Sequence, residues 1–297
     1  MKVLITGIYG QDGIILQKKF HYKNFKTFGF AKSKKNISLC KNTKIILDDL
    51  SNIFRIAQKI RVIKPDLIIH LASNNVGASL SKNFYHYYLY NLLSYMRLFI
   101  VFIIFAKNAK FILAGSSMMY DNLKNIKINE RTNFNTKSYY GLYKIHCHKI
   151  SIFFKFFFKL NYTTLILFNH DSIYRNKNFL IPRIILAIKN KNYNFIKKIY
   201  KENIQLDSSH AEDFCEAITK ICLSKNNLDK VILSSGKITK LSLIIKSALK
   251  NKIKLPTKNK KKDYLLGDCS LLKKLFKFKH KKSTNQAFKE ISKKFII

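Results

Sequence analysis

The sequence has 297 residues, 47% of them hydrophobic, which suits one large domain or a domain with a smaller lobe and excludes wholesale disorder. Its 56 lysines and arginines against 16 acidic residues give a formal net charge of +40. Because lysine supplies almost all of this charge and is spread over every segment, whereas nucleic-acid surfaces favour clustered arginine, we expect no specific nucleic-acid partner.

Short apolar runs alternate with longer helical stretches along the first part of the chain. The predicted strands are Val3–Thr6, Thr27–Ala31, Lys44–Leu47, Leu67–Leu71, Lys110–Ala114 and Thr164–Phe168, and the predicted helices are Gly13–Asn24, Ile53–Ile63, Phe84–Asn108 and Tyr139–Lys159. Strands that alternate with helices form a parallel sheet covered on both faces. We therefore predict an α/β fold, a Rossmann-type doubly wound parallel sheet with a smaller C-terminal substrate-binding lobe.

The alternation loosens after Phe168. Pro182 suits the first turn of a helix over Arg183–Lys191, and we predict a further helix over Asp213–Leu223 and a strand over Lys230–Ser234. We predict a dinucleotide-binding domain over residues 1–168. The remainder, 169–297, is predicted to be mainly a substrate-binding lobe, with a segment at about 205–236 returning to the first domain.

A glycine-rich turn follows the first predicted strand. Gly7 permits the tight turn, Gly10 lets a pyrophosphate approach the backbone, and Gly13 lets the next helix pack close to the strand. The N-terminus of that helix offers N–H groups to phosphate. This pattern favours a dinucleotide site over a plain turn.

Two strand ends carry further cofactor signals. Lys32 follows the second strand where an acidic residue would bind the 2′-hydroxyl of NAD, so NADP is the predicted cofactor and NAD the alternative. Asp48 and Asp49 follow the third strand, where a carboxylate can accept a hydrogen bond from an adenine amino group or can simply cap a helix.

The third signal combines a serine with a tyrosine and a lysine. Tyr140 and Lys144 lie four residues apart in a predicted helix, so they share a face, and an ammonium beside a phenol lowers the pKa of the phenol. Ser116 follows a predicted strand at the edge where open α/β sheets hold ligands. We predict Tyr140 as acid/base, Ser116 as its partner on the substrate oxygen, and Lys144 as the residue that tunes Tyr140.

These motifs resemble the extended short-chain dehydrogenases/reductases, the NAD-dependent epimerase/dehydratase family, and within it most closely the GDP-mannose 4,6-dehydratases. The similar stretches are Ile5–Gly13, Pro65–Ala72, Ser138–Lys144, Leu167–Ser172 with Arg175, Asp207–Phe214 and Leu265–Asp268. Together they cover nearly the whole chain.

The resemblance implies the site residues and the reaction. The cofactor residues that it implies are Gly7, Ile8, Tyr9, Gly10, Gln11, Asp12, Gly13, Lys32, Asp49, Leu50, Leu71, Ala72, Ser73, Tyr85, Lys144, His170 and Arg175. Asn169 and Arg183 are implied to face the substrate, with Ser116, Tyr140 and Lys144 catalytic. The implied reaction begins with hydride transfer at C4 of a sugar attached to a nucleotide, and the implied assembly is a homodimer or homotetramer.

One departure from the family pattern leaves the reaction open. Met118 stands where the dehydratases carry the glutamate that removes a proton beside the transient 4-keto group, and a thioether cannot act as a base. A GDP-4-keto-6-deoxy-sugar reductase or an epimerase needs no such base and is the enzymatic alternative. A catalytically silent dinucleotide-binding protein is the alternative from another class.

The cysteines and the start of the chain bear on location. Five scattered cysteines show neither CxxC nor zinc spacing, so we expect a reduced protein without a metal. Met1-Lys2 leads directly into a strand without a signal sequence. The longest purely apolar run, Leu98–Ala106, is too short to span a bilayer and is predicted to be a buried helix, although it could equally serve an interface. We expect a cytoplasmic protein without a membrane partner.

Overall fold

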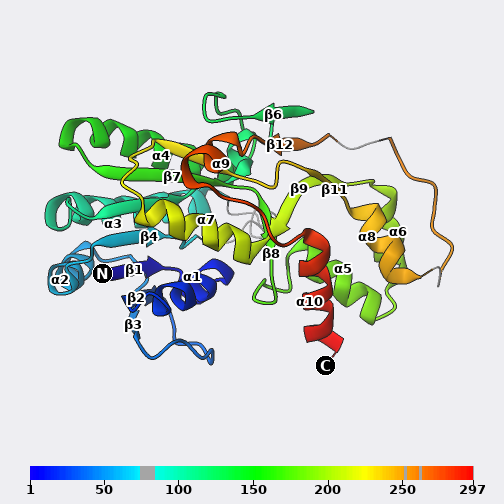
Figure 1. The fold of residues 1–297 in the computed structure, drawn as a ribbon, viewed down its shortest axis with the longest axis horizontal. Helices are drawn as coiled ribbons and strands as arrows, with labels where there is room; N and C mark the ends of the chain where they lie inside the picture. Colours follow the sequence, from blue (N-terminus) through cyan, green and yellow to red (C-terminus); the bar gives the residue numbers. More distant parts are fainter. Residues whose placement is uncertain (74–83, 251–252, 261–262, 297) are drawn as a thin grey trace. The chain divides into compact units, whose positions relative to one another are not determined.

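The computed structural model describes residues 1–73, 84–250, 253–260 and 263–296 (Figure 1). The chain divides into two compact units, each with its own core. The first comprises residues 1–121, 133–167 and 215–231, and the second comprises 122–132, 168–214 and 232–297.

The first unit is built on a parallel sheet. Its elements are β1 (Lys2–Thr6), α1 (Gln11–His21), β2 (Lys26–Ala31), β3 (Thr43–Leu47), α2 (Ile53–Ile63), β4 (Leu67–His70), α3 (Phe84–Phe105), β5 (Lys110–Ala114), η2 (Ser117–Tyr120), α4 (Tyr139–Phe158), β7 (Asn161–Leu167), most of α7 (Ala211–Leu223) and the start of β10 (Lys230–Leu233). The seven strands lie in the order β10-β7-β5-β4-β1-β2-β3, and neighbours from β3 through β7 pair in parallel. The predicted doubly wound sheet is confirmed.

The strand order reverses beside β1, which has β2 on one side and β4 on the other. Ligands of open α/β sheets bind outside the carboxyl ends of the strands at such a switch point. Leu4 and Ile68 lie on adjacent strands of the sheet and belong to one buried core. The predicted glycine turn therefore lies at the expected edge of a well-anchored strand.

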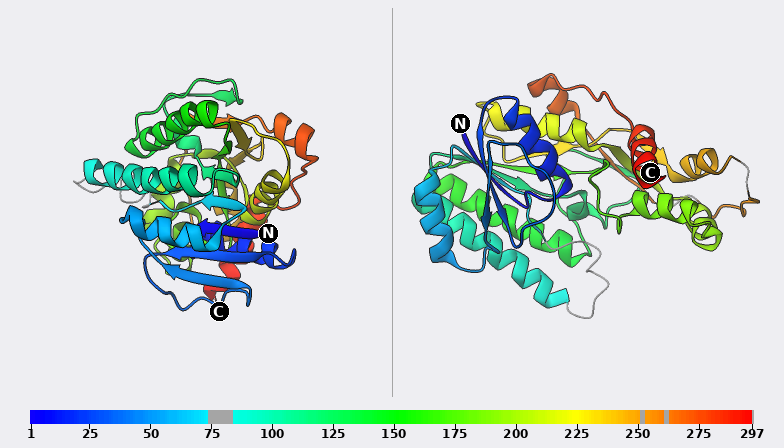
Figure 2. Two further views of the ribbon diagram at one scale, coloured as in Figure 1. Left: turned by 90° about the vertical axis from the view of Figure 1, so that its left-hand side faces the viewer. Right: turned by 90° about the horizontal axis from the view of Figure 1, so that it is seen from below.

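Helices cover both faces of this sheet, and α3 and α4 lie side by side on one of them (Figure 2). Their shared core is aromatic: Phe99 contacts Phe111 edge to face with ring centroids 5.4 Å apart, and Phe154 of α4 packs against Phe99. Tyr95 of α3 is fully buried and hydrogen-bonds Ser151 of α4. This packing fixes α4, which carries two of the predicted catalytic residues.

The run Leu98–Ala106, predicted to be a buried helix or an interface, lies in α3 up to Phe105 and is buried only on one side. Leu98 and Phe102 are buried, but Ile100, Ile104 and Phe105 on the other side of α3 are exposed. By length and composition alone, Tyr85–Phe105 would suffice to cross a membrane, with 39% of its most apolar window buried. Core helices pass the same test, and α3 contributes heavily to the core of the first unit.

The second unit is a set of small sheets and helices. Its elements are β6 (Ile126–Ile128), β8 (Asn169–Asp171), α5 (Leu180–Lys189), α6 (Tyr193–Lys201), β9 (Gln205–His210), β11 (Ile238–Lys240), α8 (Leu241–Leu249), β12 (Leu265–Gly267), α9 (Ser270–Phe276) and α10 (Thr284–Ile296). β9 pairs antiparallel with β11 and parallel with β8, and β12 pairs with β6. The helix predicted to begin at Arg183 begins at Leu180 instead, so Pro182 lies inside its first turn.

Candidate functional site: a glycine turn and a buried lysine

The glycine turn joins β1 to α1 with a backbone that only glycine tolerates well. Gly7 has φ +75°, and a Cβ there would lie 3.0 Å from the backbone nitrogen of Ala72. A Cβ at Gly13 would lie 2.5 Å from the carbonyl oxygen of Ile8, so the turn leaves no room for a larger residue at this position. Gly10 is the N-cap of α1, and no side chain caps this helix. A small-residue cradle at a helix N-terminus fits a pyrophosphate group.

The neighbouring strand end lies against this turn. The Leu71 N–H donates to the carbonyl oxygen of Thr6 at 3.3 Å, and the Ala72 N–H donates to Thr6 Oγ1 at 3.1 Å. Thr6 Oγ1 also hydrogen-bonds His70 Nδ1 at 2.9 Å. Burial, with a contribution from the charge of Lys144, lowers the pKa of His70 to about 3, so this imidazole is neutral and structural.

Lys32 and Asp49 follow β2 and β3, which are adjacent strands of the sheet. The Lys32 ammonium lies 4.2 Å from the centroid of the Tyr90 ring, and Tyr90 donates to the Asp49 carbonyl oxygen at 3.2 Å. Asp49 accepts from the Ser51 N–H and hydroxyl, and the hydroxyl bond and the Lys32 charge are among the causes that hold its carboxyl pKa below the usual value. These residues give the first unit a cation and a carboxylate at one edge of the sheet.

The simpler reading of Asp48 and Asp49 as a helix cap was wrong. Asn52 caps α2, because its Oδ1 accepts from the Phe54 N–H at 3.0 Å and the Arg55 N–H at 3.1 Å. Asp48 instead accepts from the N–H of Leu50, a buried residue with φ +62°.

Ser116 begins the turn that follows β5. Its hydroxyl oxygen accepts from the Met118 N–H at 3.2 Å and thereby caps η2. Met118 is half-buried. A Cβ at Gly141 of α4 would lie only 2.2 Å from the Met118 carbonyl oxygen, so the absence of a side chain at Gly141 lets the helix press against this turn. The close contact brings the Ser116 turn to the helix that bears Tyr140 and Lys144.

Lys144 lies buried inside the first unit. Its ammonium donates to the Ala114 carbonyl oxygen at 2.5 Å and lies 5.9 Å from the Tyr140 ring centroid. Burial lowers the pKa of Lys144 to about 8, with the nearby Cys147 acting in the opposite direction. The predicted shared face of Tyr140 and Lys144 is confirmed, and the lysine retains a proton at neutral pH.

Sequence reasoning assigned no role to Tyr143, which directly precedes Lys144 in α4. Its hydroxyl donates to Ser73 Oγ at 2.7 Å, and its ring lies edge-on to Tyr140 with centroids 5.4 Å apart. Burial holds its pKa well above the usual value, so it stays a neutral phenol. Tyr85, which the resemblance implied to be a cofactor residue, is 66% exposed near the start of α3. The buried position of Tyr143 could have been read only from the helical periodicity around Tyr140.

Four predicted residues belong to the second unit. The His170 Nδ1 atom hydrogen-bonds the Phe168 carbonyl oxygen at 2.6 Å, and its ring stacks on Phe214 with centroids 4.5 Å apart. Arg175 pairs with Asp171 at 3.0 Å. Each of these side chains is therefore held by its own unit.

The two residues implied to face the substrate are also held there. Asn169 Nδ2 donates to the Asp207 carbonyl oxygen at 3.3 Å, while the residue as a whole is exposed. The Arg183 guanidinium carbon lies 5.0 Å from the Phe195 ring centroid. Their roles toward a substrate stay predictions.

Within the described ranges, no group of three or more His, Cys, Asp or Glu side chains could hold a metal ion.

Comparison with known proteins identifies the family. The model of the family described as GDP-mannose 4,6 dehydratase matches residues 4–291. The chain is 25% identical over 254 residues to a GDP-mannose 4,6-dehydratase of Yersinia enterocolitica, a match that covers 80% of this chain and 68% of that protein.

Solved structures show the same fold at low identity. The UDP-glucose 4-epimerase of Thermotoga maritima superposes with a TM-score of 0.84 at 17% identity, covering 100% of this chain and 99% of that one. The dTDP-glucose 4,6-dehydratase of Bacillus anthracis, in complex with NAD, gives 0.83 at 15%, covering 100% and 96%. On the family match, this chain belongs to the GDP-mannose 4,6 dehydratase family of sugar-nucleotide enzymes.

Proposed function

We propose that the chain is an NADP-dependent enzyme that acts on GDP-mannose in the manner of a 4,6-dehydratase, with Tyr140 as the acid/base. The observation that carries this proposal is the buried Lys144 ammonium, 5.9 Å from the Tyr140 ring and anchored on Ala114, two residues before Ser116. A buried cation beside a phenol serves to stabilise a phenolate.

The residues of the first unit would hold most of the cofactor. The glycine turn from Gly7 to Gly13 offers backbone N–H groups to the pyrophosphate, and Lys32 offers a cation to a 2′-phosphate. The remaining residues proposed for this role are Asp49, Leu50, Leu71, Ala72, Ser73, Tyr85 and Lys144 of the first unit and His170 and Arg175 of the second. When bound, the nicotinamide would accept a hydride from the sugar.

The chain's own residues would manage the proton. The Tyr140 phenolate takes the proton of the C4 hydroxyl while the C4 hydride leaves, so C4 becomes a ketone. Ser116 donates to the same substrate oxygen, and Lys144 favours the ionised form of Tyr140 through its positive charge. Asn169 and Arg183 are proposed to contact the sugar nucleotide.

Met118 supports a second candidate reaction. A dehydratase needs a base beside the ketone, and the Met118 thioether has no proton-accepting capacity at neutral pH. Reduction of a 4-keto-6-deoxy sugar, or epimerisation, needs only the residues proposed for hydride and proton transfer. The 4-ketosugar reductase is therefore the alternative function.

The product mass separates these functions. Incubation with GDP-mannose and NADP should give a sugar nucleotide lighter by one water if the chain is a dehydratase. Consumption of NADPH with a GDP-4-keto-6-deoxy sugar, without water loss from GDP-mannose, would show the reductase. Retained NADP(H) binding without either turnover identifies a silent protein, and absence of cofactor binding contradicts the proposal. Tyr140→Phe should abolish turnover while leaving cofactor binding intact.

We also infer that the chain pairs with a second copy of itself. Exposed apolar side chains follow one side of α3 and of α4, where Ile104 is 61%, Phe153 58% and Phe157 61% exposed. Two adjacent helices with an uncovered apolar side are a typical surface for an isologous four-helix contact.

A further inference from the structure

The second unit contains a buried carboxylate that the proposed reaction does not use. Asp207 lies in β9 and is 1% exposed. Its Oδ1 atom accepts from the N–H and the hydroxyl of Ser235 at 2.7 and 2.6 Å, and its Oδ2 atom accepts from the N–H groups of Gly236 and Gly267 at 3.1 Å each. Each oxygen of this carboxylate therefore has two donors.

These bonds join three segments that are distant in the sequence. They are β9, the turn of residues 234–237 between β10 and β11, and β12. Gly236 of the turn has φ +70°, a left-handed conformation that favours glycine. A Cβ at Gly267 would lie 2.4 Å from Ser234 Cβ, so β12 and the turn approach each other closely. Asp207 thus lies where the three segments meet.

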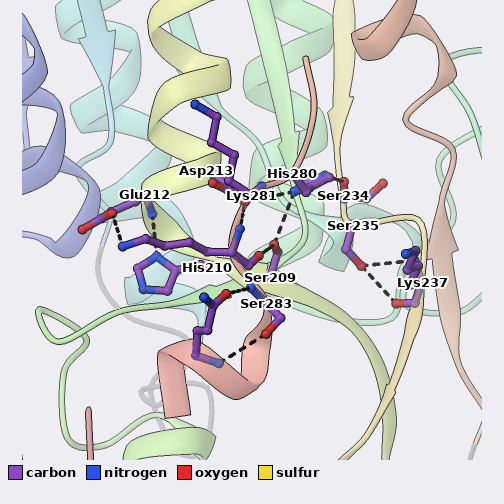
Figure 3. Close-up of polar contacts among 12 residues, drawn as sticks. Ser209, His210, Glu212, Asp213, Ser234, Ser235, Lys237, His280, Lys281 and Ser283 are labelled. Atoms are coloured by element: carbon purple, nitrogen blue, oxygen red, sulfur yellow. Dashed lines mark hydrogen bonds and ion pairs between the residues drawn. The ribbon is translucent and has the colours of Figure 1, made fainter. Parts of the chain in front are cut away.

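The turn is also fixed by bonds other than those to Asp207. The Lys237 N–H donates to the Ser235 hydroxyl oxygen at 3.1 Å, and the His280 Nε2 atom hydrogen-bonds the Ser234 carbonyl oxygen at 2.7 Å (Figure 3). The Asp207 carboxylate therefore meets donors that are already held in place, and the turn has little freedom to follow a change at Asp207.

The donors require an acceptor at both oxygens of this side chain. Burial raises the pKa of Asp207, and the hydrogen bonds from Ser235, Gly267 and Gly236 oppose this shift. A carboxylate accepts at each oxygen, whereas the amide of asparagine would turn an NH2 group toward two of the four donors. An asparagine at this position would leave buried donors without an acceptor, which costs more than the bonds alone contribute.

The backbone of Asp207 holds a residue that is proposed to contact the substrate. Asn169 Nδ2 donates to the Asp207 carbonyl oxygen at 3.3 Å, and Asn169 of β8 pairs in parallel with Ser208, which follows Asp207 in β9. Asn169 as a residue is exposed, so its amide is held and yet accessible. Because four donors fix the Asp207 side chain, they also fix the carbonyl group that orients the Asn169 amide.

We propose that Asp207 is a positioning residue for the sugar nucleotide, because its carboxylate fixes the backbone carbonyl that orients Asn169. This inference rests on the proposed function, in which Asn169 contacts the sugar nucleotide. Asp207 itself touches neither substrate nor cofactor and acts through Asn169. A change at Asp207 should therefore affect sugar-nucleotide binding and should spare the cofactor, since most residues proposed to hold NADP belong to the first unit.

The first test compares KM, kcat and cofactor affinity in Asp207→Asn. The KM for the sugar nucleotide should rise at least about fivefold, which corresponds to the loss of one hydrogen bond. The Kd of NADPH should change by less than about twofold on the same argument. Asp263→Asn makes the same chemical change at an exposed aspartate of the same unit and should leave KM unchanged. An unchanged KM in Asp207→Asn would overturn the proposal.

A double-mutant cycle tests whether Asp207 acts through Asn169. Asn169→Ala alone should raise the KM, and adding Asp207→Asn to it should raise the KM little further, because residues that act as a unit are not additive. A general loss of stability would instead multiply the two effects. Multiplied effects in the double variant would therefore contradict the positioning role.

A measurement without substrate separates this inference from the proposed function. The side-chain amide of Asn169 gives a nitrogen-15 NMR signal that Asn169→Ala identifies by its loss. Asp207→Asn should shift this signal and speed its proton exchange. Ser235→Ala, which removes one donor and keeps the carboxylate, should shift it less and serves where Asp207→Asn does not fold.

The two possible failures then look different. An unchanged Asn169 signal in folded Asp207→Asn, or in Ser235→Ala where that variant replaces it, overturns the positioning role whatever the activity of the protein. A shifted signal in a protein that binds no sugar nucleotide confirms that Asp207 positions Asn169 and contradicts the proposed function.

Discussion

The Lys144 ammonium donates a hydrogen bond of 2.5 Å to the carbonyl oxygen of Ala114, at the carboxyl end of β5. This one contact joins the helix that carries Tyr140 to the strand that leads into the Ser116 turn. The burial of Lys144 lowers its pKa to about 8 instead of the usual 10.5, so burial determines over which pH range the charge is present.

We predict that turnover falls as the pH rises through about 8, because Lys144 then loses the charge that stabilises the Tyr140 phenolate. Between about 8 and 10.5 the unfolded chain binds more protons at this residue than the folded chain, so the folding cost of Lys144 declines as pH rises through that window. A pH–rate profile would therefore fall while the protein stays folded. Lys144→Met should abolish turnover, whereas Lys149→Met, at an exposed lysine of the same helix, should not. A flat profile through pH 8 contradicts the assignment.

Gly141→Ala should destabilise the protein strongly. The added methyl group would meet the Met118 carbonyl oxygen at 2.2 Å and Thr136 Oγ1 at 2.3 Å, and the carbonyl is backbone that cannot rotate away. We expect a loss of about 3 kcal/mol in the free energy of unfolding, the upper end for overpacking, measured by urea denaturation. Leu142→Ala, at an exposed neighbour, should change it by less than about 0.5 kcal/mol. Equal stability of the two variants would show that α4 can shift away from η2 without cost.

The sheet of the first unit was predictable because its strands are short apolar runs, of which β1, β4 and β5 are almost entirely buried. The strand Lys110–Ala114 and the helix Ile53–Ile63 were predicted to the residue. The strands of the second unit were missed, since β8 and β9 read as polar sequences, Asn169–Asp171 and Gln205–His210. These strands form through pairing between segments far apart in the chain, as in β9 with β11. No local alternation of apolar and polar residues in the sequence indicates such pairing.

In the candidate site too, some features could be predicted from the sequence and others could not. The order of the glycine turn, Ser116, Tyr140 and Lys144 could be read from the sequence, because each motif is local. The complete burial of Lys144 could not, since lysines are usually exposed and its carbonyl partner belongs to another element. Outside this site, the approach of His280 Nδ1 to an Asp213 carboxylate oxygen at 3.7 Å joins two residues that are distant in the sequence, so it is visible only in the fold.

Met118→Glu should create or increase the loss of water from GDP-mannose. The substitution places a carboxylate in the turn that Ser116 caps, where the dehydratase pattern has its base. The measurement is the ratio of dehydrated to intact sugar nucleotide by mass spectrometry, with Met118→Gln as the control of similar size that has no basic group. Equal ratios in the two variants would show that this position does not supply the base.

Lys110→Met should weaken the end of α7. The buried Lys110 ammonium donates to the carbonyl oxygens of Ile221, Ser224 and Asn226 at 2.7, 2.9 and 3.1 Å, all within the first unit. Removing a charged donor from several buried acceptors should cost about 2–3 kcal/mol of unfolding free energy. Lys107→Met removes an exposed lysine and should be nearly neutral in the same denaturation experiment. Equal unfolding free energies of the two variants would show that water can replace the Lys110 ammonium as the donor to these carbonyl groups.

Phe153→Glu should separate the proposed dimer. Phe153 is exposed on α4 within the apolar side formed with α3, so a carboxylate there would be buried without a partner in an isologous contact. Two chains of net charge +40 repel each other, and salt screens this repulsion, so the unmodified protein should dimerise more tightly as ionic strength rises. Light scattering after size-exclusion chromatography would report the mass at low and high salt. Tyr22→Glu changes an exposed aromatic residue beyond α1 and should leave the dimer intact. A monomer at every salt concentration contradicts the pairing, because the apolar side of α3 and α4 would then remain in water.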